Sequence, residues 1–243
     1  MPGSSAIASA VKRLRKTEAV CFDLDDTLLQ TAYLTECAVN SATKVMEDHG
    51  RSGAIPKDRI GDVFWRDGET QFKELLKVPT GEIPAEMVLS AEETAYANLR
   101  LYPGTIRLLR LLIRAGMSSA IVTNGKSRWQ WRKILKSGLR YFINEVIVSE
   151  DIGGIEKPKP EIFEYTLSIL DVPADRTLFV GDDLGSDILG AKGVDMMTVR
   201  VLQGKHAAER PSNPEETPLL EISSIGDLGF YLWRYSRCCN RLK

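Results

Sequence analysis

The stretch Glu18–Thr27, EAVCFDLDDT, decides the fold class of this 243-residue chain. Its first five residues are mostly apolar, and three acidic residues, Asp23, Asp25 and Asp26, follow almost at once. A short apolar run that ends in carboxylates is typical of a buried strand whose end meets a polar edge. In an open α/β sheet, ligands bind outside the carboxyl ends of the strands. The stretch therefore predicts a buried strand with a functional edge directly behind it.

Further strands and helices alternate along the chain behind this one. A helix is expected from Pro103, which suits a first helical position, to Gly116, which suits a helix end. Alternating strands and helices favour a mostly parallel sheet that is covered on both faces. The sequence thus predicts an α/β fold with a Rossmann-like parallel sheet core. The other expected strands are 119–122, 145–148, 177–180 and 197–201, and the other expected helices are 127–138, 160–173, 186–193 and 225–235.

Residues 33–101 break the alternation, because no strand is expected there and the apolar residues fall at helical spacing. Turn-forming residues separate three apolar groups. We therefore predict a small α-helical domain, inserted into a core that is formed by residues 1–32 and 102–243. The three apolar groups lie within residues 39–46, 63–76 and 87–99.

The composition excludes several classes of protein. Hydrophobic residues make up 43% of the chain and charged residues 27%, which is typical of soluble globular proteins. The 32 Lys and Arg residues balance 33 Asp and Glu residues, so no bulk charge favours a nucleic-acid partner. No apolar run approaches the roughly 20 residues of a membrane span. We expect a cytoplasmic protein, monomer or homodimer, without a nucleic-acid or membrane partner.

The cysteines predict neither a disulfide framework nor a zinc site. The chain has four cysteines and two histidines, and no zinc-binding spacing joins them. Reduced thiols are the simpler interpretation. The pair Cys238 and Cys239 and the basic segment 1–16 receive no functional role; the segment is interpreted as a surface tail or a short helix.

Chemically suitable side chains follow four of the expected strands, far apart in the sequence but at the same edge of the predicted sheet. Taken singly, each set is explained by a turn or a helix cap. Four sets in order at strand ends are hard to obtain as independent caps, and they predict one cleft. The sets are Asp23 and Asp25; Thr123 and Asn124; Lys157; and Asp182, Asp183 and Asp187.

Phosphoryl transfer is the chemistry that needs such a combination. Carboxylates at close quarters repel one another and favour a hard cation such as Mg²⁺. One carboxylate can attack phosphorus, and a second acid can protonate the leaving oxygen and later activate water. A hydroxyl, a backbone N–H and a lysine can hold the remaining phosphate oxygens.

The set resembles the haloacid dehalogenase-like (HAD) hydrolase superfamily, whose motifs are D-x-D-x-T, a strand that ends in Thr or Ser, a lysine, and G-D-x(3–4)-D. The similarity extends from about Ala19 to Val201 and includes IVTNG, GIEKPKPEIF and FVGDDLGSDILGA. The inserted helical segment is similar to the cap of the C1 subgroup. The resemblance implies a Mg²⁺-dependent phosphatase that hydrolyses a small phosphorylated metabolite through an aspartyl-phosphate intermediate.

The resemblance also implies roles for the acidic residues. Asp23 would be the nucleophile and a metal ligand, and Asp25 the general acid and base, with its backbone carbonyl on the metal. Asp182 would be a further metal ligand, and Thr27 would support the first motif by hydrogen bonding. Asp183 departs from the usual small polar residue, which leaves the choice between Asp182 and Asp183 open.

The remaining roles concern the phosphate. By the same resemblance, Thr123 and Asn124 would contact the phosphoryl group, and Lys157 would pair with both the phosphate and Asp23. Asp187 would lie one shell further out and orient Lys157 or a metal-bound water. These assignments are predictions from the matching motif positions.

Other functions are weighed against the phosphatase. A 2-haloacid dehalogenase of this superfamily lacks the second motif acid, which is present here as Asp25. A phosphomutase and a catalytically silent binding protein on the same scaffold stay open. A phosphonatase would need a cap lysine that nothing singles out, and a signalling receiver domain leaves the helical insert unexplained.

Two groups of aromatic residues are more simply interpreted as packing than as ligand contacts. In the helix expected at 127–138, one tryptophan is expected in the core, and the basic residues Arg128, Arg132 and Lys133 are expected on an exposed face. In the insert, the candidates for substrate contact are Tyr33, Phe64, Trp65, Arg66, Phe72 and Tyr96.

Overall fold

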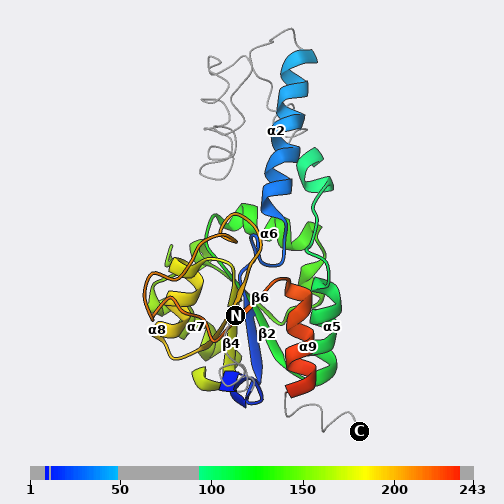
Figure 1. Cartoon of the computed structure of the whole chain (residues 1–243). Coiled ribbons are helices and arrows are strands. Elements are labelled where there is room, and N and C mark those ends of the chain that lie inside the picture. Colours follow the sequence, from blue (N-terminus) through cyan, green and yellow to red (C-terminus); the bar gives the residue numbers. More distant parts are fainter. Residues whose placement is uncertain (1–8, 11, 49–92, 236–243) are drawn as a thin grey trace. The chain divides into compact units, whose positions relative to one another are not determined.

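The computed structural model describes residues 9–10, 12–48 and 93–235 (Figure 1). The chain divides into two compact units, residues 1–30 with 101–243 and residues 31–100. The apolar group expected within 63–76, residues 87–91 of the group expected within 87–99, and the pair Cys238 and Cys239 lie outside the described residues. The role of the inserted segment as a cap stays a prediction.

The first unit is built on a six-stranded sheet in which every neighbouring pair of strands is parallel, in the order β3-β2-β1-β4-β5-β6. All four residues of β1 are buried, as expected for a strand with neighbours on both sides. The predicted α/β fold with a parallel sheet core is confirmed. The strands are β1 (Ala19–Phe22), β2 (Ser118–Thr123), β3 (Glu145–Val148), β4 (Thr177–Gly181), β5 (Met197–Val201) and β6 (Leu220–Ile222).

Helices cover both faces of this sheet, with α5 and α9 on one face and α7 and α8 on the other (Figure 1). Among the described residues, no helix is long and apolar enough to cross a membrane. The helices of the first unit are α5 (Thr105–Ala115), α6 (Ser127–Lys136), α7 (Pro160–Leu170), α8 (Leu189–Gly193) and α9 (Ile225–Tyr235), joined by short turns η1 (Leu139–Tyr141), η2 (Ser149–Ile152), η3 (Ala174–Arg176) and η4 (Leu184–Ile188).

Two local expectations differ from the structure. A sixth strand, β6, lies at the sheet edge, in the part of the chain between the expected strand 197–201 and the expected helix 225–235, where no strand was expected. Its three residues alternate between buried and exposed, a signal too short to separate from a loop in the sequence. The helix expected at 186–193 begins earlier, with a single π-helical turn at η4, before α8 continues it.

The second unit contains α2 (Thr31–Asp48), and residues 93–97 are also helical. Leu34, Ala95 and Tyr96 are buried. The guanidinium of Arg100 lies 3.8 Å from the centre of the Tyr33 ring, a cation–π contact between the two ends of this unit's sequence. Tyr33 and Tyr96 thus both make packing contacts within this unit.

The close packing of α8 fixes the segment that carries the last acidic motif. Phe163 of α7 packs edge-on against Phe179 of β4, with ring centres 5.2 Å apart. A Cβ atom on Gly190 would lie 2.5 Å from the Phe163 ring and 2.9 Å from Cα of Pro158. Only a residue without a side chain allows α8 to approach this closely.

We expect Gly190→Ala to lower the free energy of unfolding by about 1–3 kcal/mol, because the added methyl group overpacks the contact with Phe163. The measurement is urea denaturation followed by circular dichroism. Gly193→Ala, in the same helix, is the matched control, since a Cβ there meets nothing within 4 Å. Equal losses in both variants would contradict this explanation.

Candidate active site

Asp23 stands at the carboxyl end of β1, and only 8% of it is exposed. Its backbone N–H donates to the carbonyl of Val180 on β4 at 2.9 Å, which fixes its place between two strands. The chain then turns back tightly: Leu28 and Leu29 both donate their N–H groups to the carbonyl of Leu24. This turn carries Asp25 and Thr27 over the same sheet edge.

Asp182 follows the end of β4 and is 3% exposed. Thr27 Oγ1 donates to Asp182 Oδ1 at 3.3 Å, so the first and last acidic motifs are in direct contact. The buried Arg200 of β5 donates from Nε to the backbone carbonyl of Asp182 at 3.1 Å. Arg200 was not foreseen, because a single arginine in a strand gives no signal of burial.

Asp183 points elsewhere, because it caps the helical segment that follows. Its Oδ1 accepts hydrogen bonds from the backbone N–H groups of Gly185 at 2.8 Å and Ser186 at 3.2 Å. Burial opposes ionisation, but these bonds and the nearby His206 lower the pKa of Asp183 below its usual range. Of the two adjacent acids, Asp182 is therefore the one that faces Asp23.

Lys157 lies between two carboxylates. Its ammonium donates to Asp23 Oδ1 at 2.6 Å and to Asp187 Oδ1 at 2.7 Å, and its side chain is 2% exposed. Asn124 holds the Lys157 backbone: its Oδ1 accepts from the Lys157 N–H at 2.8 Å, and its Nδ2 donates to the Lys157 carbonyl at 2.9 Å. The side chain of Asn124 thus positions the lysine, while its backbone follows β2.

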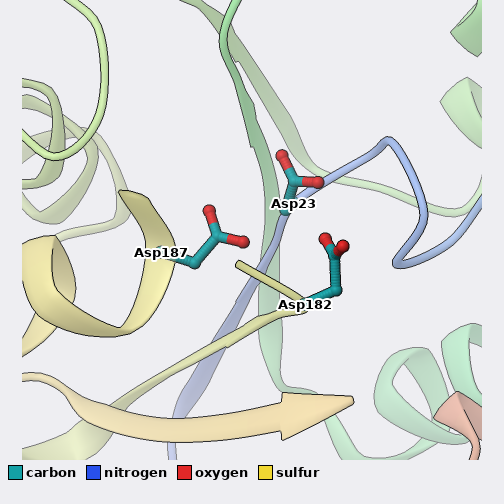
Figure 2. A group of neighbouring side chains, drawn as sticks. All are labelled: Asp23, Asp182 and Asp187. Atoms are coloured by element: carbon teal, nitrogen blue, oxygen red, sulfur yellow. The ribbon is translucent and has the colours of Figure 1, made fainter. Parts of the chain in front are cut away.

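The carboxyl groups of Asp23, Asp182 and Asp187 face one another (Figure 2). One carboxylate oxygen from each lies within 4.8 Å of those of the other two, and all three residues are buried. Asp182 Oδ2 is buried and has no hydrogen-bond partner among the described residues. An oxygen-only set with an unsatisfied buried carboxylate oxygen fits a hard divalent cation. Asp187, expected one shell further out, lies within this group.

The pKa values of Asp23, Asp182 and Lys157 reflect burial and crowded charge. Burial, together with the neighbouring carboxylates, raises the pKa of Asp23 to about 7 and that of Asp182 to about 9. Lys157 opposes both shifts. Burial would lower the pKa of Lys157 itself, but the carboxylates of Asp187 and Asp23 raise it above its usual range.

Asp25 meets helix α6, a contact that the sequence did not reveal. The Lys133 ammonium lies 2.7 Å from Asp25 Oδ1 and 2.8 Å from Oδ2, and the Lys133 side chain is 2% exposed. Gln130 Nε2 donates to Asp25 Oδ2 at 2.9 Å and to Thr123 Oγ1 at 2.7 Å.

The expected exposed basic face of α6 is therefore wrong for Lys133, and Arg132 is only half-exposed, whereas Arg128 is exposed as expected. The expected core tryptophan is Trp129, which is 8% exposed. Gln130 and Lys133 are three residues apart and share one helical face, so their spacing was the available signal.

Comparisons with known proteins identify the family of the chain. The family model of the haloacid dehalogenase-like hydrolases matches residues 17–195. The glyceraldehyde 3-phosphate phosphatase of Methanopyrus kandleri is 32% identical, over 87% of this chain and 95% of that protein.

Two solved structures extend the comparison. A HAD phosphatase from Thermococcus onnurineus superposes with a TM-score of 0.65 at 29% identity, over 89% of this chain and 98% of the other. The putative HAD-hydrolase YfnB of Bacillus subtilis, solved bound to magnesium, gives a TM-score of 0.60 at 25% identity, over 89% and 98% of the two chains.

The structure thus has a parallel-sheet α/β core with buried carboxylates at its strand ends. The chain belongs to the haloacid dehalogenase-like hydrolase family, because the model of that family covers most of it and the relative from M. kandleri matches nearly end to end. The predicted family and the predicted hydrolase class are confirmed.

The raised pKa values of Asp23 and Asp182 predict how metal binding depends on pH. In the metal-free folded protein, Asp23 and Asp182 keep their protons up to about pH 7 and pH 9, whereas in the unfolded chain they lose them near the usual value of 3.8. The free energy of unfolding therefore falls as the pH rises from that value through about 7 and 9. A divalent cation favours the ionised carboxylates, so its stabilising effect grows over this range. We expect MgCl₂, at 100 times the dissociation constant that holds at pH 9, to raise the melting temperature by about 5–10 °C at pH 9. The same concentration is expected to raise it by less at pH 6, where protons compete for the carboxylates.

Differential scanning fluorimetry with MgCl₂, and with KCl at matched ionic strength, measures this effect. Asp182→Asn is expected to reduce the magnesium-dependent shift at pH 9. A shift that is larger at pH 6 than at pH 9 would contradict the assignment of these carboxylates as ligands.

Proposed function

We propose that this protein is a Mg²⁺-dependent phosphatase that hydrolyses a small phosphomonoester through an aspartyl-phosphate intermediate on Asp23. The observation that carries the proposal is the meeting of Asp23, Asp182, Asp187 and Lys157 in one buried cluster at the strand ends. Thr123 and Asp25 lie at the same edge, linked through Gln130. The names of the relatives in M. kandleri and T. onnurineus support the same class.

In the first step, a carboxylate oxygen of Asp23 attacks phosphorus. The bond from phosphorus to the leaving oxygen breaks, and its electron pair stays on that oxygen, which takes a proton from Asp25. Lys157 is placed to donate to Asp23 and to a phosphate oxygen beside it, because its ammonium already contacts Asp23 at 2.6 Å. Its charge offsets the negative charge of the transition state.

In the second step, water attacks the aspartyl phosphate and gives a proton to Asp25. The bond between phosphorus and the Asp23 oxygen breaks, inorganic phosphate leaves, and the Asp23 carboxylate is restored. Thr123 Oγ1 and the backbone N–H groups after β2 are the donors proposed for the remaining phosphate oxygens. The sum of the two steps is the hydrolysis of one phosphate ester by one water molecule.

The metal would be held by the carboxylates of Asp23 and Asp182 with the Asp25 backbone carbonyl, and Asp187 stands close enough to contribute. A bound divalent cation supplies positive charge that offsets the repulsion between carboxylates and phosphate. The magnesium in the YfnB structure supports this choice of cation. Asp183 takes no part, because it caps the segment after Asp182.

Triose phosphates are the first substrates to test, since the M. kandleri relative is named for glyceraldehyde 3-phosphate. Other sugar phosphates, nucleoside monophosphates and phosphoglycolate complete the panel. The inserted unit, residues 31–100, is proposed to act as a cap that excludes water and contacts the leaving group. Such a cap favours small, diffusing substrates.

We expect release of p-nitrophenol from p-nitrophenyl phosphate with MgCl₂ and none with EDTA. Asp23→Asn is expected to remove the activity, because an amide cannot act as this nucleophile, and Asp25→Asn to lower it about 10²–10⁴-fold. Steady-state kinetics at saturating MgCl₂ measure both effects.

Asp171→Asn is the matched control for these variants. Asp171 is exposed and has a positive φ of 52°, a conformation that asparagine also adopts, so the control is expected to keep full activity. Activity that survives in Asp23→Asn, or that is metal-independent and directed at 2-haloacids, would overturn the proposed function.

A further inference from the structure

We propose that Lys133 and Gln130 of α6 are positioning residues that hold Asp25 in place for proton transfer to the leaving oxygen. The proposal rests on the proposed phosphatase function, in which Asp25 is the general acid. It goes beyond that function because it assigns roles to two residues of α6, which follows the strand that ends at Thr123. The pairing joins positions 108 residues apart in the sequence.

The geometry of Asp25 fits a side chain that is fixed yet still accessible. Both of its oxygens lie within 2.8 Å of the Lys133 ammonium, and one also accepts from Gln130 at 2.9 Å. Its side chain nevertheless remains 29% exposed, whereas that of Lys133 is 2% exposed. A general acid needs both properties, since it must stay in one orientation and still reach the substrate.

The burial of Lys133 makes the pairing specific. An ammonium that has lost its water must be compensated by charge and hydrogen bonds, and Asp25 supplies a carboxylate with both oxygens in contact. The pairing is with the ionised form of Asp25, which is the form left once its proton has passed to the leaving oxygen, and Lys133 stabilises that form. Lys133 therefore acts on the reaction through Asp25 and not by touching the substrate.

Gln130 couples Asp25 to the phosphate-binding segment. Its Nε2 lies within hydrogen-bonding distance of Asp25 Oδ2, of Thr123 Oγ1 and of the carbonyl oxygen of Asn124, the last two at 2.7 and 2.6 Å. One buried amide thus fixes the acid relative to the residues proposed to hold the phosphoryl group. A shift of either segment would disturb the alignment of acid and leaving oxygen.

The dependence on the leaving group separates this role from a merely structural one. Phenyl phosphate and 2,4-dinitrophenyl phosphate are both aryl esters, but their leaving groups differ in basicity. Only the phenolate of phenyl phosphate is basic enough to need a proton as it leaves. The value of kcat/KM reports the steps up to cleavage of the ester. A variant that misplaces the general acid loses kcat/KM for phenyl phosphate and keeps it for the dinitrophenyl ester. A general distortion of the site lowers both.

We expect Lys133→Met to lower kcat/KM for phenyl phosphate about 100-fold and to change that for 2,4-dinitrophenyl phosphate less than about threefold. Gln130→Met is the second variant, and it leaves no unpaired buried charge. It is expected to lower kcat/KM for phenyl phosphate about 10-fold and to leave that for 2,4-dinitrophenyl phosphate nearly unchanged. This variant still tests the proposal if Lys133→Met does not fold. Lys136→Met, at an exposed position of the same helix, is the matched control with unchanged kinetics.

A double-mutant cycle with Asp25→Asn provides the second readout. If Lys133 acts through Asp25, Lys133→Met causes little further loss of phenyl phosphate hydrolysis in the Asp25→Asn background. Equal losses for both esters, or full additivity in the cycle, would overturn the positioning role while leaving the phosphatase intact. Hydrolysis of the dinitrophenyl ester by the wild type, abolished in Asp23→Asn, verifies the phosphatase separately.

Discussion

The rest of the site depends on one interaction, the pairing of the Lys157 ammonium with the carboxylates of Asp23 and Asp187. These two acids and Asp182 crowd three carboxylates into a buried space, and one ammonium offsets only one of the charges. Burial, and next to it the excess negative charge, raises the pKa values of Asp23 and Asp182 when no cation is bound. A site of this kind favours both a hard cation and an incoming group that binds to one.

The parallel sheet supplies the framework that holds these charged side chains close together. The central strand β1 is hydrogen-bonded to β2 and β4, so the residues behind these three strands meet at one edge although they are far apart in the sequence. Direct hydrogen bonds between these segments then orient the side chains: Asn124 fixes the Lys157 backbone, and Thr27 donates to Asp182. The close approach at Gly190 anchors the segment that carries Asp187. A rigid, buried scaffold thus holds the three carboxylates together against their mutual repulsion.

The sequence predicted much of this arrangement because strand ends carry short, dense motifs. The strands at Ala19–Phe22, Glu145–Val148 and Met197–Val201 were recognisable from apolar runs, and their direction followed from the alternation with helices. The edge strand β6 was not, since three residues carry too weak a periodic signal. The burial of Lys133 was also missed: basic residues near the surface are the common case, and only the facing carboxylate of Asp25 reverses it.

The sequence by itself determined the fold class, the family, and the edge of the sheet at which the acids and Lys157 gather, because these follow from local patterns and their order along the chain. The tertiary structure decided the pairings. It distinguished Asp182 from its neighbour Asp183, which turns away to cap a helix, and it brought Asp187 into the carboxylate group. It also joined Asp25 to α6. Such choices depend on side-chain directions and on burial, which arise only when segments distant in the sequence pack together.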